Sequence, residues 1–339
     1  MKPKLLIVEL WGLGDLAIAT PFLRAASERF DVTLLAKPYA LDLQRRLWPG
    51  VRIIAFVAPW TAFKNKYRLW QWPWREITRL RNQLAGEHFD FGVSARRITS
   101  PPLSGDLRDH LLLKLFGVQH RIGFPFLHRR FFLTQHVAHP GPESHRYESW
   151  RAMARALDIK LPSHEEIPFP AVAGRRMVLI HTGAGQPVRV WPLERYKNLA
   201  ARLRQKKFQV QIACDPDQCS WWLRAGETGV ATPETVAELI ELTDRAGALI
   251  GNDSGPGHLA AFCGVPTFTL FGAQLPEWFA PLHPASEWIE GKACPYRSCS
   301  DYCRFPTPFC LWDISEEEVW TRVEAFVEKH SQKCQAACA

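Results

Sequence analysis

A short turn in the second half of the chain, residues 253–258 (DSGPGH), has the composition of a phosphate-binding site. It follows an apolar run and precedes a helical pattern. Backbone N–H groups at a helix start bind phosphate with the help of the helix dipole, and Gly255 lets the backbone approach the ligand. Asp253, Ser254 and His258 add hydrogen-bonding side chains at the same place. The alternative is a helix start without a ligand, capped by Ser254 or Asp253.

Two further segments of the second half carry groups suited to a nucleotide. Thr182 and Gly183 end an apolar run in the sequence HTG, and Arg189 lies just before Trp191 and Pro192 at a second helix start. A guanidinium group can pair with a pyrophosphate through two hydrogen bonds. An exposed loop arginine without a ligand is the alternative for Arg189.

Asp15 follows the first apolar run of the chain and is another candidate for chemistry. Gly12, Gly14 and Ala17 match the relaxed glycine fingerprint of dinucleotide-binding folds, so an NAD(P)-dependent oxidoreductase is one alternative. Two details oppose it. The Asp15 carboxylate would repel a pyrophosphate, and the next apolar run ends at Lys37 rather than at a ribose-binding acid. A carboxylate in a cleft can instead act as a general base toward a hydroxyl, and helix capping is the structural alternative.

A segment rich in proline and aromatic residues contains four cysteines, Cys294, Cys299, Cys303 and Cys310. Their spacings of five, four and seven residues differ from the Cys-x-x-Cys pairs typical of zinc sites. The sequence leaves open both a structural zinc or iron and reduced thiols without a metal.

Apolar runs of strand length alternate with helical patterns in both halves, which indicates α/β units with parallel sheets covered on both faces. We predict strands at 5–10, 32–36, 91–94, 177–181, 208–214, 246–251 and 265–271, and helices at 21–30, 77–84, 150–157, 193–204, 233–242, 256–263 and 315–330. Ligands of such sheets bind beyond the carboxyl ends of the strands, where the segments above lie. The expected domains are 1–170 and 171–330 with a tail over 331–339. The helix at 315–330, which opens with a capping-box pattern, is a candidate to cross back to the first domain.

The composition is that of a folded protein with an anionic partner. The chain has 339 residues, 47% of them hydrophobic and 22% charged, and its length favours two domains. No apolar run is long enough to span a membrane, and the first one lacks the features of a secretory signal, so we expect a cytoplasmic protein. The net charge of +8 favours nucleic acid, a phosphorylated sugar or a membrane surface.

Tryptophans and basic residues are mixed in one stretch of the first half. They are Trp60, Trp70, Trp72 and Trp74 among Lys64, Lys66, Arg68 and Arg75. This mixture suits a membrane interface, where indole rings lie at the headgroup level and cations meet lipid phosphates. A solvated loop with its tryptophans folded onto the core is the alternative.

In order and separation, the candidate segments resemble glycosyltransferase family 9, the bacterial heptosyltransferases that build the inner core of lipopolysaccharide. The resemblance covers nearly the whole chain. Its motifs are Gly14-Asp15, HTG at 181–183, RVWPLER at 189–195, NDSGPGHLAA at 252–261, GVPT at 264–267 and LFG at 270–272. The segment at 252–261 is the most specific of them.

The resemblance implies a GT-B fold, in which two Rossmann-like domains face each other across a central cleft. It implies that the first domain binds the acceptor and the second binds ADP-heptose. It places the catalytic aspartate at Asp15, the cation that contacts phosphate at Arg189, and further donor contacts at Thr182, Gly183, Asp253, Ser254, Gly255 and His258. Val190 departs from the pattern, because many relatives carry a basic or polar residue there.

The implied reaction is inverting: Asp15 deprotonates an acceptor hydroxyl, which attacks the anomeric carbon as ADP leaves. We expect no cofactor and no catalytic metal, because a helix dipole and a cation stabilise the departing diphosphate.

The implied partners are a nucleotide sugar and a lipid-linked anionic oligosaccharide, with no nucleic acid, at the inner face of the cytoplasmic membrane. Basic residues of the first half are candidates for acceptor recognition, namely Lys64, Lys66, Arg68, Arg96, Arg97, Arg108, Arg129 and Arg130. The alternative to an enzyme is a non-catalytic carbohydrate- or nucleic-acid-binding protein of the same fold, which the positive charge also suits.

Overall fold

The computed structural model describes residues 1–61, 68–96, 105–125, 132–171, 174–299 and 302–331. The chain divides into two compact units, Met1–Ser163 (unit 1) and His164–Ala339 (unit 2). The division falls within the proline-rich stretch, before the predicted boundary at residue 170. Several predicted acceptor residues lie outside the described residues, namely Lys64, Lys66, Arg97, Arg129 and Arg130.

Unit 1 is built on a six-stranded parallel sheet in the order β3-β2-β1-β4-β5-β6. Its strands are β1 (Lys4–Glu9), β2 (Asp31–Ala36), β3 (Arg52–Ala55), β4 (Phe91–Ser94), β5 (His120–Gly123) and β6 (Gln135–His136). In β1 every residue after Lys4 is buried, as expected for a strand covered on both faces. Its last residue, Glu9, pairs in register with Ala36 at the end of β2.

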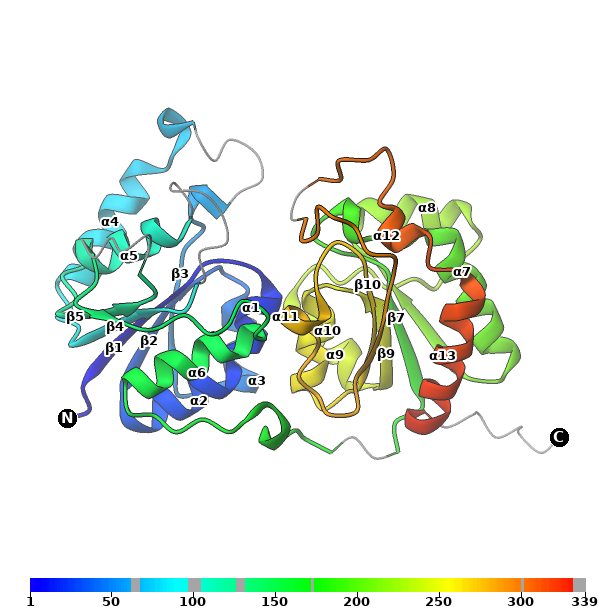
Figure 1. Ribbon diagram of the computed structural model, residues 1–339, viewed down its shortest axis with the longest axis horizontal. Coiled ribbons are helices and arrows are strands. Elements are labelled where there is room, and N and C mark those ends of the chain that lie inside the picture. Colours follow the sequence, from blue (N-terminus) through cyan, green and yellow to red (C-terminus); the bar gives the residue numbers. More distant parts are fainter. Residues whose placement is uncertain (62–67, 97–104, 126–131, 172–173, 300–301, 332–339) are drawn as a thin grey trace. The chain divides into compact units, whose positions relative to one another are not determined.

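Helices cover both faces of this sheet (Figure 1). They are α1 (Leu13–Ile18), α2 (Thr20–Arg29), α3 (Ala40–Leu47), α4 (Trp74–Ala85), α5 (Gly105–Leu115) and α6 (Arg146–Ala156). Leu6 and Val8 of β1 share one core with Leu80 of α4 and Leu113 of α5. On the other face α2 packs against α6, and the rings of Phe22 and Trp150 lie 5.0 Å apart.

Unit 2 repeats the design with a five-stranded parallel sheet in the order β11-β10-β9-β7-β8. Its strands are β7 (Met177–His181), β8 (Gln209–Ala213), β9 (Ala246–Asn252), β10 (Thr267–Phe271) and β11 (Glu287–Glu290). All residues of β7, β9 and β10 are buried. The strand β7 lies between β8 and β9, so the turns that follow β7 and β9 meet at one edge of the sheet.

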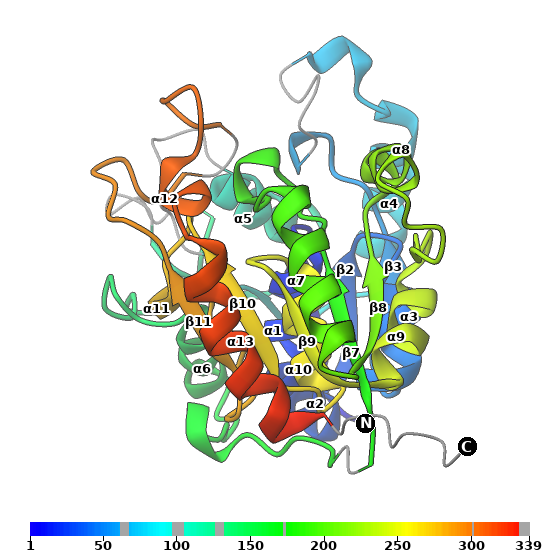
Figure 2. The ribbon, with the colours of Figure 1, turned by 90° about the vertical axis from the view of Figure 1, so that its right-hand side faces the viewer.

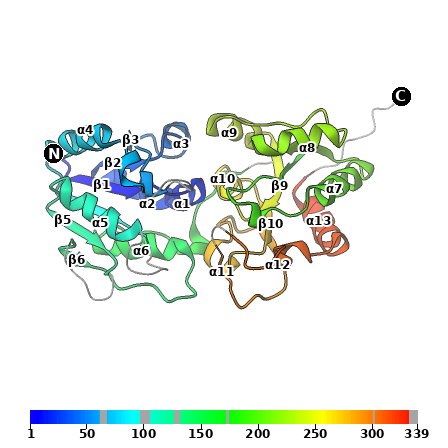
Figure 3. The same cartoon turned by 90° about the horizontal axis from the view of Figure 1, so that it is seen from above.

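The helices of unit 2 again lie on both faces of the sheet (Figures 2 and 3). They are α7 (Leu193–Gln205), α8 (Cys219–Arg224), α9 (Val236–Asp244), α10 (Gly255–Phe262), α11 (Pro276–Phe279), α12 (Phe309–Trp312) and α13 (Glu316–His330). The helix α13 packs into the core of unit 2, where Val323 and Phe326 join Phe268 of β10. Its start has the predicted capping box, because Ser315 and Glu318 exchange hydrogen bonds.

The predicted fold class is confirmed: both units are α/β with parallel sheets. In the described part of the chain, none of the helices is both long and apolar enough to cross a membrane.

Candidate active site

The buried side chain of Asn252 joins the segments that the sequence proposed for the donor site. Its Nδ2 donates to the carbonyl oxygen of Thr182 at 2.9 Å. Its Oδ1 accepts from the backbone N–H of Trp191 at 3.0 Å and from the hydroxyl of Tyr196 at 2.8 Å. Asn252 is 1% exposed, so these bonds hold the turns after β7 and β9 and the start of α7 in one arrangement.

Gly183 lies where a side chain would not fit. A Cβ atom at this position would lie 2.2 Å from the carboxyl carbon of Asp215, which follows β8. The Asp215 carboxylate also accepts a hydrogen bond from the N–H of Ala184, so the turn folds around this acid. Burial raises the pKa of Asp215, against the opposing effect of His181, and burial lowers the pKa of His181.

Thr182 holds this turn from inside the unit. Its side chain is fully buried, its hydroxyl donates to Oε1 of Gln218 at 2.8 Å, and it accepts from the Trp222 indole at 3.3 Å. The hydroxyl is therefore engaged within the protein, and Thr182 shapes the turn through these bonds.

The start of α10 and Arg189 come together beside this turn. Ser254 stands at the N-cap position of α10, but it makes no side-chain capping bond there, and its hydroxyl donates to the carbonyl oxygen of Asn252 at 3.2 Å. A guanidinium nitrogen of Arg189 lies 3.4 Å from Oδ2 of Asp253. Among the described residues, Nε of Arg189 has no hydrogen-bond partner although it is buried. This corner therefore offers backbone and guanidinium donors to an anion.

His258 is the remaining predicted residue of the donor site. It lies in α10 and is 5% exposed. The structure thus brings the predicted residues of unit 2 into one region at the carboxyl ends of β7 and β9.

In unit 1, Asp15 lies at the carboxyl end of β1, in the first turn of α1. Its Oδ2 accepts from the N–H of Gly12 at 3.2 Å. Gly12 is the N-cap residue of α1, and Asp15, the third residue of the helix, bonds back to it instead of capping the helix itself. Oδ1 of Asp15 lies 3.5 Å from Nε of Arg146, the first residue of α6. The Asp15 side chain is 23% exposed, so it also remains accessible to a ligand.

Sequence reasoning missed several charged and polar residues around Asp15. Glu9 is 2% exposed and accepts from the N–H of Trp11 at 3.2 Å. Burial raises the pKa of Glu9 to about 7, and the charge of Asp15 adds to that effect. A glutamate at the end of an otherwise apolar strand is a signal that could have identified Glu9. Arg146 lies far along the chain, and no local pattern connects it with Asp15.

The same arrangement argues against a dinucleotide at this turn. Two carboxyl groups, those of Glu9 and Asp15, already accept the N–H groups of Trp11 and Gly12, where a pyrophosphate would need to bind. Lys37 follows β2, where a ribose-binding acid would be expected. The oxidoreductase alternative is therefore not favoured.

The sequence left open whether the four cysteines hold zinc or iron or remain thiols without a metal. Within the described residues, no three His, Cys, Asp or Glu side chains are grouped so that they could hold a metal ion. The sulfur of Cys299 instead donates to the carbonyl oxygen of Tyr296 at 3.3 Å, and that of Cys303 lies 3.7 Å from the carbonyl oxygen of Thr307. Burial raises the pKa of Cys310 to about 11, and the neighbouring thiols of Cys294, Cys303 and Cys299 add to that shift.

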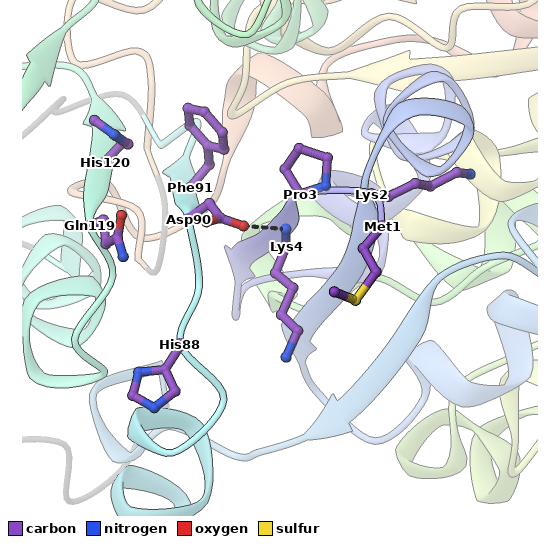
Figure 4. Close-up of a pocket in the computed structure, with 9 residues that line it drawn as sticks. All are labelled: Met1, Lys2, Pro3, Lys4, His88, Asp90, Phe91, Gln119 and His120. Atoms are coloured by element: carbon purple, nitrogen blue, oxygen red, sulfur yellow. Dashed lines mark hydrogen bonds between the residues drawn. The ribbon is translucent and has the colours of Figure 1, made fainter.

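One cavity of unit 1 lies at the opposite edge of the sheet from Asp15. It has a volume of about 470 Å³ and is lined by the residues before β1 and those that begin β4 and β5, including Lys4, Asp90 and His120 (Figure 4). Ligands of open parallel sheets bind at the carboxyl ends of the strands. This cavity is at the amino ends, so we do not assign it to the active site.

Comparison with known proteins identifies sequence relatives of this chain. Lipopolysaccharide heptosyltransferase 3 of Escherichia coli K12 is 30% identical over 140 residues, which are 38% of this chain and 37% of that protein. Lipopolysaccharide heptosyltransferase 1 of Pseudomonas aeruginosa is 24% identical over 211 residues, which are 54% of this chain and 59% of that protein. The aligned part of this chain thus spans between about a third and three fifths of the length of these relatives.

Solved structures match nearly the whole chain. E. coli heptosyltransferase WaaC with ADP superposes with a TM-score of 0.70 at 16% identity, covering 95% of this chain and 99% of WaaC. E. coli ADP-heptose lps heptosyltransferase II superposes with a TM-score of 0.68 at 17% identity, covering 96% and 99%. These likenesses show the fold, which is the GT-B fold with two Rossmann-like domains. The family model of glycosyltransferase family 9 (heptosyltransferase) matches residues 77–306, and the chain therefore belongs to this family.

Proposed function

We propose that the chain is an inverting glycosyltransferase that moves a heptose from ADP-heptose to a lipopolysaccharide core or a related acceptor. The observation that carries the proposal is the Arg189–Asp253 pair, 3.4 Å apart, beside the uncapped start of α10 in a chain of this family. The structural neighbour solved with ADP supports the choice of nucleotide.

In this proposal, unit 2 binds the donor. The pyrophosphate of ADP lies at the N-terminus of α10, near Gly255, and Arg189 donates hydrogen bonds to it. The same positive groups stabilise the charge that develops on the departing diphosphate, so the reaction needs no catalytic metal. Gly183 and His258 also contact the donor. The hydrogen bonds of Asn252 to Trp191 and Thr182 hold these segments in their positions relative to one another.

Asp15 is the general base. One of its oxygens takes the proton of the acceptor hydroxyl while that hydroxyl oxygen bonds to the anomeric carbon and the bond to ADP breaks. Attack from the side opposite the leaving group inverts the anomeric centre. Arg146 orients the carboxylate through the 3.5 Å contact with Oδ1, and the N–H of Gly12 holds the other oxygen.

Replacing Asp15 by asparagine tests this role. Asp15→Asn keeps a group that can accept from the Gly12 N–H but removes the proton acceptor, so kcat should fall by about 10²–10⁴-fold with unchanged ADP-heptose affinity. Asp158→Asn is the control, because that side chain is 97% exposed and lies elsewhere in unit 1. Turnover by Asp15→Asn equal to that of the control would remove Asp15 from the mechanism.

An anionic acceptor is supported by the basic residues of unit 1. Of those predicted to recognise it, the structure describes Arg68, Arg96 and Arg108. The guanidinium of Arg96 lies 3.2 Å from the ring centre of Trp11, in the loop that leads into α1, so a cation stands close to the proposed base. This placement suits an acceptor with phosphate or carboxylate groups near the reacting hydroxyl.

We further propose that unit 1 binds an anionic membrane surface near the start of α4. Trp70 is 78% exposed and Trp74 is 51% exposed, whereas the ring of Trp72 packs against that of Trp60, with the ring centres 5.6 Å apart, and anchors the segment. Exposed arginines lie before and after them in the sequence, namely Arg68, Arg75, Arg79 and Arg81. Indole rings and guanidinium groups together favour the interface of a bilayer with anionic headgroups.

Co-sedimentation with vesicles tests this surface. The double variant Trp70→Ala/Trp74→Ala should lose binding to vesicles that contain anionic lipid, whereas Trp288→Ala in unit 2, where the indole is 41% exposed, should keep it. Equal binding to purely zwitterionic vesicles, or no effect of the double variant, would contradict the proposal.

A further inference from the structure

Two carboxyl groups share one turn of unit 1. The backbone N–H of Trp11 donates to Oε1 of Glu9, and the next N–H along the chain, that of Gly12, donates to Oδ2 of Asp15, each at 3.2 Å. Tyr39, the N-cap residue of α3, completes the turn, because its hydroxyl donates to the carbonyl oxygen of Trp11 at 2.7 Å. Adjacent peptide groups therefore hold a buried glutamate and a partly exposed aspartate against the same short segment.

Cations reach this pair from three other elements. Arg146 at the start of α6 is 9% exposed and contacts Asp15. Arg96 comes from the loop after β4 and lies over Trp11, and Lys37 directly follows β2, whose last residue, Ala36, pairs with Glu9. Burial lowers the pKa of Lys37, with the charges of Asp15 and Glu9 opposing the change.

These surroundings determine how Glu9 titrates. Desolvation and the charge of Asp15 raise its pKa to about 7, and Arg146, Arg96 and the Trp11 N–H oppose that shift. The hydroxyl of Tyr39 stays protonated, because burial and the two carboxylates raise its pKa. Glu9 therefore changes its charge near neutral pH.

We propose that Glu9 is a positioning residue for the transfer reaction, holding the turn that carries Asp15 and, by its charge, strengthening the attraction of Asp15 for the acceptor proton. The inference rests on the proposed function. An ionised Glu9 places a negative charge beside Asp15 and favours proton uptake there, whereas a protonated Glu9 does not. In each turnover the acceptor O–H bond breaks and an Asp15 O–H bond forms. Asp15 then returns the proton to water, and the charge of Glu9 is the same before and after.

The pH profile of Glu9→Gln tests the proposal. The amide oxygen still accepts from the Trp11 N–H, so the turn is kept while the charge is removed. Wild-type kcat should rise as the pH passes through about 7, and Glu9→Gln should lose this rise and have a kcat on the order of tenfold lower at about pH 8.5, with unchanged KM for ADP-heptose.

Asp90→Asn is the matched control. Asp90 accepts from the N–H of Lys4 at 2.8 Å, so it performs the same kind of bond at the opposite end of β1 (Figure 4). This variant should keep the wild-type rise. A rise retained in Glu9→Gln, or lost equally in Asp90→Asn, would overturn the role of Glu9.

Two further measurements separate the possible failures. If Asp15→Asn turns over normally, the proposed function fails; if it is inactive while Glu9→Gln keeps the wild-type profile, only the present inference fails. Infrared difference spectra of the wild-type protein require no variant to fold. They should show a buried carboxylic acid losing its proton near pH 7, and the absence of such a group would also overturn the proposal.

Discussion

Truncation of Asn252 should destabilise unit 2 more than its small size suggests. Asn252→Ala removes three hydrogen bonds and leaves the carbonyl oxygen of Thr182, the N–H of Trp191 and the hydroxyl of Tyr196 buried without this partner. A net hydrogen bond contributes about 1 kcal/mol, and a buried group left unpaired costs about 1–3 kcal/mol. The carbonyl oxygen of Thr182 also accepts a hydrogen bond from Nε2 of Gln218, so in Asn252→Ala this one group of the three still has a partner. We therefore expect a loss of about 3–5 kcal/mol.

Urea unfolding of the full chain measures this loss, with ADP binding by calorimetry as a second readout. ADP affinity should fall together with stability, because Asn252 joins the turn after β7 to the segment that carries Arg189. Asn198→Ala is the matched control: it removes one partly exposed bond to Glu316 and should cost less than about 1 kcal/mol. A loss below about 1 kcal/mol for Asn252→Ala, with normal ADP binding, would refute the assignment of Asn252 as the centre of this site.

Three other outcomes follow from the structure. Gly183→Ala should destabilise unit 2 by about 2–4 kcal/mol because its Cβ would clash with the Asp215 carboxylate, and adding Asp215→Gly should restore much of the stability measured by thermal unfolding. Arg189→Ala should weaken ADP binding by about 10–100-fold in calorimetry, whereas Arg195→Ala, whose guanidinium binds the carbonyl of Ile314, should leave ADP affinity unchanged. Glu9 has a folded-state pKa of about 7 against a usual 4.5, so the native state holds its proton more tightly than the unfolded state. Stability should therefore fall as pH rises from about 4.5 to 7, by up to about 3 kcal/mol, and unfolding of Glu9→Gln at each pH should lack this decline.

Local sequence patterns predicted the elements that form the centres of both sheets. The strands Phe91–Ser94 and Met177–His181 have the predicted bounds, because each is an apolar run bounded by polar or turn residues. The short edge strands Arg52–Ala55 and Glu287–Glu290 were not predicted. Each is only four residues long, with two adjacent apolar residues at its centre, so pairing with a neighbouring strand decides its conformation.

The site was predictable where its residues lie close together in the sequence. The turn at 253–258 and the HTG segment combine strand end, glycine and helix start, so their position at the sheet edge follows from topology. Glu9 and Asn252 lie in two of the predicted segments, but the functional prediction for those segments named other residues. The contacts of Asp15 with Arg146 and of Gly183 with Asp215 depend on tertiary packing, which the spacing of apolar residues along the sequence does not predict.

The four cysteines are a segment for which the sequence left two alternatives open. Their number and proximity in sequence suggested a cluster. In the structure, the sulfurs of Cys299 and Cys303 are paired with carbonyl oxygens of their own loop, and the other three thiols contribute to the raised pKa of Cys310. Across the part of the chain that the structure describes, no three His, Cys, Asp or Glu side chains are grouped so that they could hold a metal ion.

Transfer from ADP-heptose to a defined acceptor tests the central claim most directly. The purified chain is incubated with ADP-heptose and a lipid-linked core acceptor that lacks heptose, and the acceptor is followed by mass spectrometry while ADP release is measured. We predict that the acceptor gains the mass of one heptose with one ADP released, and that Asp15→Asn gives neither product. An unchanged acceptor across a panel of core acceptors, or product formed equally by Asp15→Asn, would contradict the account.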